Sequence, residues 1–312
     1  MIDMIPDKTP DVIAVGHLCM DKICFCEDYP EENTSRRVLQ FSEHPGGTVS
    51  QAMAALSRLG VKTGYLGDFG SDAAARFLHE DCRREGIDVS RCRFHPDTAH
   101  AFTTVAVNVR RNTRTFFSYH GKFPPLSFSP EDERYLAGAR LLHLDNTDPE
   151  NALAAAKLAK KLGVPVSLDG SSMAKDNEKN WALVRLTDIL ITNDRFPSRL
   201  TGIPDRAGAL LEIFRQVHPK VLISTAGEHG CLAFVDGMLR HFPAFSVKTV
   251  DTTGAGDVFH GAFLYSLLHE MPLAVGIRFA SAAAAISCGA PGGRDGIPNL
   301  AQVEAFLAAH PE

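Results

Sequence analysis

The 312-residue chain lacks a CxxC pair, an HExxH motif, a long apolar run and a basic cluster. Its seven cysteines are odd in number, which argues against a disulfide framework or a zinc site and indicates reduced thiols in a cytoplasmic protein. The longest apolar stretch, residues 279–286, is far too short to span a membrane. No run of Lys or Arg exceeds two residues and the net charge is -5, so neither nucleic acid nor a membrane is an expected partner.

Two common nucleotide-binding motifs are absent as well. The chain has no GxxxxGK[ST] sequence, which argues against a P-loop NTPase. No GxGxxG follows the first predicted strand, so a nicotinamide dinucleotide site is a distant alternative. Residues 1–10 lack the basic start and apolar core of a signal peptide, and we expect them to form a tail.

Short apolar runs alternate with helical patterns along most of the chain. The predicted strands are 11–16, 61–67, 141–144, 164–169, 189–192 and 221–225, with a hairpin at 231–241. The predicted helices are 48–59, 72–85, 149–162, 180–186, 256–270, 273–288 and 300–309, with two more on either side of Gly202. This alternation predicts an α/β fold of three layers, with a doubly wound, mostly parallel sheet.

Two segments do not fit that alternation. Residues 17–45 contain strand-like and turn-like stretches, and residues 100–122 contain a hairpin signal around the polar turn 110–112. We expect both to form a small separate sheet that acts as a lid over the main one. Arg110, Arg111 and Arg114 in this hairpin are either solvated charges or contacts to an anionic substrate group.

The segment 250–259 (VDTTGAGDVF) reads as the end of a strand, a glycine turn and the first turn of a helix. Gly254 and Gly256 have no side chains, so their backbone N–H groups can approach an anion closely. The positive end of the following helix points to the same place. Asp257 lies in that first turn, either as a plain helix-start residue or as a general base beside an anion hole.

Several strand ends in the C-terminal half are polar and rich in glycine. In a parallel sheet, the ends at Asp169, Asn193 and Thr225 open onto one edge, beside the 254–257 turn. Thr225 and Gly227 would line the phosphates or ribose of a nucleotide, and Gly230 would let the backbone close around it. Residues 289–293 carry no bulky side chain and would pass beside a base or a monovalent ion.

The N-terminal half offers a second set of polar residues. Asp21 falls just beyond the first strand, where it either meets a polar ligand or remains a solvated loop residue. The pair Gly46 and Gly47 opens a predicted helix, so it either admits a ligand closely or forms a plain turn.

These motifs carry a family resemblance. DTTGAGDVFHGAF (251–263) closely resembles the C-terminal signature of the ribokinase-like (PfkB) sugar kinases, and GGTVSQAMAALSRLG (46–60) resembles their N-terminal signature. The spacing from Gly16 to Asp21, the TAGEHG turn and the GGRDGIP segment fit the same family. The resemblance covers about residues 11–309.

The resemblance implies one kinase domain over residues 11–310 that uses ATP and Mg²⁺ to phosphorylate a sugar hydroxyl. It implies that Asp257 is the catalytic base and that the anion hole consists of Gly254, Ala255 and Gly256. It implies acceptor binding by Asp21, Gly46, Gly47, Gln51 and Arg110. It implies nucleotide binding by Asn193, Thr225, Gly227, Gly230 and Gly292. Backbone oxygens near Asp251 and Thr253 would match the K⁺ site that many members have, and a homodimer through the lid is expected.

Two positions depart from the family pattern. Gln51 stands where the N-terminal signature usually has Asn, and Phe196 stands where the magnesium motif NxxE has Glu. Asp194 or Asp169 would then have to serve the metal. The Phe variant, together with LDG at 168–170 and PGGRDGIP, looks most like the sulfofructose-kinase and ketohexokinase-like branch, which favours a ketose acceptor. The alternatives are a kinase for ribose, a nucleoside or a sugar phosphate, and a non-catalytic regulator that binds sugar or nucleotide on the same fold.

Overall fold

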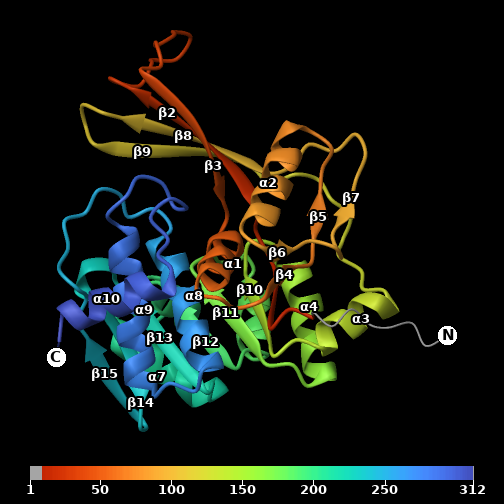
Figure 1. The fold of residues 1–312 in the computed structure, drawn as a ribbon, viewed down its shortest axis with the longest axis vertical. Coiled ribbons are helices and arrows are strands. Elements are labelled where there is room, and N and C mark those ends of the chain that lie inside the picture. The colour runs from red at the N-terminus through yellow and green to blue at the C-terminus, as the bar shows by residue number, and fades with distance from the viewer. Residues whose placement is uncertain (1–8, 312) are drawn as a thin grey trace.

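The computed structural model describes residues 9–311 and is organised around one nine-stranded sheet. Its strand order is β15-β14-β13-β12-β11-β10-β1-β4-β6 (Figure 1). The bounds are β1 Val12–Val15, β4 Thr63–Tyr65, β6 Ile87–Asp88, β10 Leu141–Asp145, β11 Val166–Gly170, β12 Ile189–Thr192, β13 Val221–Thr225, β14 Cys231–Val235 and β15 Met238–Phe242. Only the β13–β14 and β14–β15 pairings are antiparallel among these strands, so the mostly parallel sheet is confirmed.

Helices cover both faces of this sheet. Alternate residues of each strand point to opposite faces, and two hydrophobic clusters form accordingly. One face packs against α1 Thr48–Arg58, α2 Ala73–Arg84, α8 Ala255–Leu268, α9 Leu273–Ser287 and α10 Leu300–Ala309. The other packs against α3 Pro130–Ala137, α4 Pro149–Leu162, α5 Asn177–Val184, α6 Phe196–Thr201 and α7 Arg206–Val217. The predicted three layers are therefore present.

A second sheet has the order β3-β2-β8-β9 and rises from the main body (Figure 1). Its strands are β2 Cys19–Cys26, β3 Gln40–Gly46, β8 Phe102–Asn108 and β9 Thr113–Tyr119. They come from the two segments singled out in the sequence, 17–45 and 100–122. The register places Asp21, Thr103 and Ser118 side by side across three strands, on the face that also carries His44.

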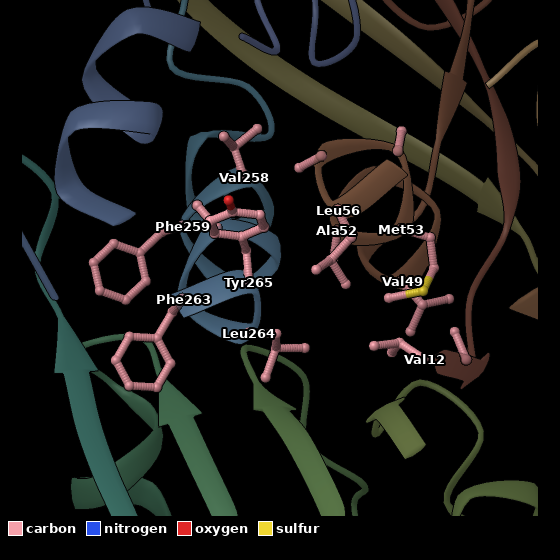
Figure 2. Packing of buried hydrophobic residues seen from close by; sticks show 14 of the residues in the cluster. Val12, Val49, Ala52, Met53, Leu56, Val258, Phe259, Phe263, Leu264 and Tyr265 are labelled. Carbon is pink, nitrogen blue, oxygen red and sulfur yellow. The ribbon is translucent and has the colours of Figure 1, made fainter. Parts of the chain in front are cut away.

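The close packing of α1 against α8 positions the glycine-rich ends of both helices. Apolar side chains of α1 face those of α8 across this contact (Figure 2). A Cβ atom on Gly261 would lie 2.4 Å from the carbonyl oxygen of Ala52 and 2.8 Å from the Cβ of Ala55, so only glycine allows this approach. The starts of the two helices, at Gly47 and Gly254, are therefore held on one side of the molecule.

The structure differs from the sequence-based expectation in several places, including the unpredicted strand β6. No strand leads into the 254–257 turn, because residues 243–250 run as irregular chain and only the backbone N–H groups of Val250 and Asp251 bond, both to Cys288. Helix α3, which a Ser129 capping box begins, was not predicted. A short parallel pair, β5 Asp68–Phe69 with β7 Arg93–Phe94, was also missed because two-residue strands show no period.

Two further observations concern the part of the chain that the model describes. No helix within residues 9–311 is both long enough and apolar enough to cross a bilayer. Within the same residues, no three or more His, Cys, Asp or Glu side chains gather as a metal site would require. The predicted tail lies mainly in residues 1–8, outside the described residues, whereas Pro10 is buried.

Candidate active site

The N-terminus of α8 presents unpaired backbone donors. Gly254 is the N-cap residue in the left-handed conformation, with φ 74°. The N–H of Ala255 donates to the Thr252 carbonyl at 3.2 Å, so it is not free as the sequence suggested. The N–H groups of Gly256 and Asp257 have no acceptor among the described residues, as expected for the first turn of a helix. These two donors and the helix dipole make the turn suited to an anion.

Asp257 extends from the same turn into a strongly acidic environment. Burial raises the pKa of Asp257 well above its usual value, and the nearby carboxylates of Asp169, Asp145 and Asp21 raise it further. The Asp257 side chain is still partly accessible, as a group that meets a ligand must be. No Lys or Arg pairs directly with Asp145, Asp169 or Asp257 within residues 9–311. Arg294, which is paired with Asp81, opposes these effects and lowers the pKa of Asp257.

Asp145, at the end of β10, is a site residue that the sequence reasoning missed. Its Oδ2 accepts hydrogen bonds from the backbone N–H of His17 at 2.7 Å and from the hydroxyl of Thr48. Its Oδ1 accepts the N–H of Thr147 at 2.9 Å. It is fully buried, and it joins the end of β1 to the start of α1. The pattern that indicated Asp169, an acid at the end of a short apolar strand, is also present in LLHLD (141–145) and predicts Asp145 as a site residue.

Below these carboxylates lies a buried pair of histidines. His260, one turn after Asp257 on α8, places its Nε2 3.7 Å from Oδ2 of Asp169. Its ring lies 5.9 Å from that of His143 on β10. Burial lowers the pKa of His143 to about 4 and that of His260 to about 3, so both are neutral near pH 7. They do not neutralise the acidic set.

Two loops meet at the base of the 254–257 turn. Oδ1 of Asp251 accepts the N–H and the hydroxyl of Thr253, at 2.9 and 2.8 Å, and its Oδ2 accepts the N–H of Gly292 at 3.0 Å. A Cβ on Gly254 would lie 3.0 Å from the Cα of Gly293. The 251–254 and 289–293 segments are therefore in backbone contact, an arrangement that brings several carbonyl oxygens near one another.

The residues predicted for the acceptor lie at the start of α1 and on β2. The Asp21 carboxylate lies against Gly46, where an added Cβ would be 2.3 Å from Oδ2. Burial raises the pKa of Asp21, while Cys19 and His44 act in the opposite direction. Gly47 has φ 96°, and a Cβ there would be 2.2 Å from the carbonyl oxygen of His17. The glycine pair is thus required by the fold as well as open to a ligand.

Gln51 has a structural contact that the sequence did not suggest. Its Nε2 donates to the Pro45 carbonyl at 2.9 Å and lies 2.5 Å from where a Cβ on Gly293 would be. Its Oε1 is buried without a partner among the described residues. The extra methylene relative to Asn therefore carries the amide toward the 289–293 loop.

The arginines of the β8–β9 hairpin separate into two groups. Arg110 is exposed at the turn and pairs with Glu27 and Asp28, which follow β2, at 2.6 and 3.1 Å. Arg114 instead donates to the hydroxyl of Thr253 at 2.9 Å and lies 3.8 Å from Asp251. The structure therefore ties Arg114, and not Arg110, to the loop beside α8.

The residues predicted for the nucleotide lie at the ends of β12 and β13. The Asn193 side chain holds the turn just before α6, because its Oδ1 accepts the N–H groups of Arg195 and Phe196 at 3.1 and 2.8 Å. Thr225 donates to the Thr192 carbonyl at 3.2 Å, and Gly227 is exposed with space around it. Gly230 has a structural reason to be glycine, since its Cβ would lie 2.0 Å from the carbonyl oxygen of Phe242.

Phe196 is among the most deeply buried aromatic residues of the chain. It is 1% exposed, and its ring would lie 3.3 Å from a Cβ on Gly170. This position therefore supplies packing under the end of β11, and no carboxylate. Asp194 is exposed nearby, whereas Asp169 is buried and accepts the N–H of Ser171 at 2.7 Å.

Known proteins similar to this chain are carbohydrate and nucleoside kinases. The model of the family described as pfkB family carbohydrate kinase matches residues 9–300. A nucleoside kinase of Methanothermobacter thermautotrophicus is 28% identical over 302 residues, covering 96% of each chain. Ketohexokinase of Mus musculus is 27% identical over 294 residues, covering 90% of this chain and 97% of the relative.

The fold is shared with solved ribokinases. The structure of Arabidopsis thaliana ribokinase complexed with ribose and ATP superposes with a TM-score of 0.86, at 24% identity, covering 96% of this chain and 99% of that one. The family match spans nearly the whole chain and includes both helix starts that form the site. The chain therefore belongs to the pfkB family of carbohydrate kinases.

Proposed function

We propose that this ATP-dependent carbohydrate kinase transfers the γ-phosphoryl group of ATP to a hydroxyl of a small sugar, a ketose in preference to ribose or a nucleoside. One observation carries the assignment of the site: Asp257 and the two free N–H groups of Gly256 and Asp257 share one helical turn. A base and an anion-binding turn are thus held in fixed relation.

In the proposed mechanism, Asp257 removes the proton of the acceptor hydroxyl as that oxygen attacks the γ-phosphorus in line. The bond from phosphorus to the bridging oxygen of ADP breaks, and the proton remains on the Asp257 carboxyl until product leaves. The N–H groups of Gly256 and Asp257 face the charge that develops on the transferring group. The raised pKa of Asp257 makes it a stronger base than an ordinary carboxylate.

Although no cluster of three or more metal-ligating side chains lies in the described residues, Mg²⁺ keeps several waters and is bound through one or two carboxylates and the substrate phosphates. Buried carboxylate oxygens without a Lys or Arg partner are ligands that Mg²⁺ accepts directly or through water. With Phe196 in place of a carboxylate, we propose that Asp169 serves Mg²⁺, which would neutralise phosphate charge when bound. The contact of the 251–254 and 289–293 loops supports a K⁺ site of backbone carbonyls near Asp251 and Thr253.

We assign the nucleotide to the ends of β12 and β13, at Thr225 and the open surface of Gly227. The acceptor lies on the other side of Asp257, beside Asp21 and the Gly46–Gly47 pair, which are in contact with each other. The β3-β2-β8-β9 sheet covers it and excludes water, which limits hydrolysis of ATP. Arg114 and His44 support this arrangement, because both join that sheet to the loops beside α8.

The test is release of ADP from ATP and Mg²⁺ with fructose, other ketoses, sulfofructose, ribose, fructose 6-phosphate and adenosine, with and without K⁺. Asp257→Asn should lower kcat by about 10²- to 10⁴-fold with little change in sugar binding. Glu80→Gln, which alters an exposed acid of α2, is the control and should retain activity. Near-normal turnover by Asp257→Asn would refute the assignment of the base.

Buried Phe196 favours one second candidate, a regulator that binds sugar or nucleotide without turnover. Phe196 stands where the NxxE magnesium motif has Glu. Its ring is buried and fills the space beside Gly170, so no carboxylate lies at that position. Binding of ATP in the absence of ADP formation with every acceptor would support this alternative.

We also propose a homodimer through the smaller sheet. Phe41 and Phe117 lie on the face opposite Asp21 and are 55% and 63% exposed, which is unusual for large apolar side chains. A second copy of this sheet would cover both rings. Analytical ultracentrifugation should show a dimer that Phe41→Asp with Phe117→Asp converts to monomer. A monomeric parent chain would contradict the proposal.

A further inference from the structure

A cavity of about 290 Å³ lies where the smaller sheet joins the body of the molecule. Four chain segments make that junction, between β1 and β2, β3 and α1, β7 and β8, and β9 and α3. Three of the four line the cavity, at residues 16–18, 100–101 and 120–123. Residues 65–68 at the end of β4 and the start of α4 supply the remaining walls. The position of the smaller sheet therefore depends on the segments that surround this junction cavity.

The junction cavity is distinct from the acceptor site. Its lining includes neither Asp21 nor the Gly46–Gly47 pair, and fully buried Asp145 separates it from Asp257. The link between the two is indirect, because His17 lines the cavity and its backbone N–H donates to Asp145 at 2.7 Å. A ligand in the cavity would not meet the acceptor, but it would contact the segments that hold the smaller sheet above it.

Three side chains of the junction cavity have polar groups to spare. The rings of His17 and His120 lie 5.6 Å apart, between centroids, and neither ring has a hydrogen-bond partner among residues 9–311. Burial lowers the pKa of His17, so its neutral ring offers one N–H donor near pH 7. Lys122 is exposed at the cavity and has no ion-pair partner in the same part of the chain. These side chains offer hydrogen-bond donors to a ligand.

The acidic residues that line the junction cavity are already bonded within the protein. Asp68 is neutralised by Arg93, which contacts both of its oxygens at 2.9 Å, and by His95 at 2.7 Å. Asp148 caps the start of α4 and accepts two donors from Asn151. Neither carboxylate is thus left to receive a cation.

Two further polar groups of the lining are bonded as well. His100 accepts the N–H of Gly70 on Nδ1, and its Nε2 lies 3.1 Å from the Leu18 carbonyl oxygen, to which it donates. The hydroxyl of Tyr65 donates to the Gly16 carbonyl at 2.9 Å. With these groups occupied, the donors of His17, His120 and Lys122 favour an anionic ligand.

Much of the remaining lining is apolar, which limits the rest of the ligand. A volume of about 290 Å³ holds about ten non-hydrogen atoms, at the roughly 30 Å³ that each water occupies in the liquid. The ligand therefore combines one anionic group with a short carbon skeleton. The apolar side chains that would face this skeleton are Val15, Leu66, Phe123, Leu126, Pro149 and Ala152.

We propose that the junction cavity binds a small organic anion of about ten non-hydrogen atoms, and that this effector holds the smaller sheet over the acceptor site. Its carboxylate or phosphate group accepts hydrogen bonds from Lys122, His17 and His120. The cavity has this shape while Arg114 of the smaller sheet contacts Thr253, so a ligand that fits it stabilises that arrangement over others. The effect on turnover rests on the proposed function, whereas binding of the anion does not.

Calorimetric titration of the whole chain tests binding. Malate carries the anionic group as carboxylate and glycerol 3-phosphate carries it as a phosphate ester, while glycerol is the neutral control. We expect at least one of the two anions to bind, and glycerol to give no binding. Lys122→Met should weaken binding of the anion by about ten- to a hundred-fold, as loss of a charged hydrogen bond does. Lys157→Met removes an exposed lysine of α4 outside the cavity and is the matched control.

Steady-state release of ADP tests the effect on the smaller sheet. The anion that binds should lower KM for the acceptor by about five-fold or more, and Lys122→Met should abolish this effect. Coupling between two sites is reciprocal, so the acceptor should tighten binding of the anion by the same factor. Calorimetry with and without the acceptor measures that factor in the absence of ATP.

The outcomes separate the effector site from the kinase assignment. If neither anion binds, or if Lys122→Met binds the anion as tightly as the parent chain, the effector site is overturned while the kinase assignment stands. An anion that binds and leaves KM for the acceptor unchanged overturns the control of the smaller sheet. If no acceptor releases ADP, the proposed function fails, and anion binding that is weakened in Lys122→Met still supports the effector site.

Discussion

Replacing Gly261 with Ala tests whether the approach of α1 to α8 sets the geometry of the site. The new Cβ would lie 2.4 Å from the Ala52 carbonyl oxygen, whereas ordinary contact begins at 3.4 Å, so the helices must part by about 1 Å. The obstacle is backbone, which cannot rotate away. Overpacking of this kind costs about 1–3 kcal/mol of unfolding free energy. A displacement of about 1 Å at a catalytic group can cost about 10²-fold in rate.

Thermal unfolding and steady-state ADP release measure the two effects. For a chain of this size we expect the melting temperature to fall by about 2–4 °C for each kcal/mol lost. Gly208→Ala in α7 is the control, because its Cβ would meet only side-chain atoms, the nearest at 3.2 Å. It should keep full activity and gain about 1 kcal/mol in helix propensity. Parent-like kcat and melting temperature in Gly261→Ala would refute the argument that this contact positions the site.

Three further predictions concern residues around the site. Asp145→Asn removes a negative charge that raises the pKa of Asp257, so the acid limb of kcat/KM against pH should move to lower pH. An unmoved limb would show that Asp145 does not act on the pKa of Asp257. Arg114→Ala removes the contact to Thr253 and should raise KM for the acceptor by about five- to tenfold, with an unchanged melting temperature. An unchanged KM would show that this contact does not hold the lid. Arg294→Met breaks a buried ion pair at 2.9 Å, and denaturant titration should show a loss of about 3–5 kcal/mol; a loss below 1 kcal/mol would contradict that role.

Much of the fold could be read from the sequence because its signals are local. The helix at 149–162 and the strands at 189–192 and 221–225 lie at the predicted bounds, since periodicity and Pro or Gly mark their ends. The turn at 254–257 was predicted from glycines and an acid in one helical turn. The strand expected before it is absent because the irregular chain there is held by the backbone of Cys288, a distant partner.

The rest of the site depends on which strands become neighbours. Asp145 and Asp169 act together only because β10 pairs with β11, and His143 meets His260 only because α8 lies over these strands. Nothing within the sequence near Gln51 shows that its amide turns toward Gly293. Such contacts join segments that are far apart in the chain, so no local pattern in a single sequence predicts them.

The hydrogen bonds around Arg294 have a consequence for how the chain folds during synthesis. Its guanidinium donates to the carbonyl and hydroxyl of Ser50 on α1, 244 positions earlier, while Arg58 donates to the Arg294 and Ile297 carbonyls. During synthesis the apolar face of α1 stays exposed until α8 and the 289–297 segment have left the ribosome. Such long-range closure slows folding and exposes surface that aggregates. Nascent chains stalled before residue 255 should therefore be bound by chaperones and be inactive, with activity appearing only once the last fifth of the chain is present.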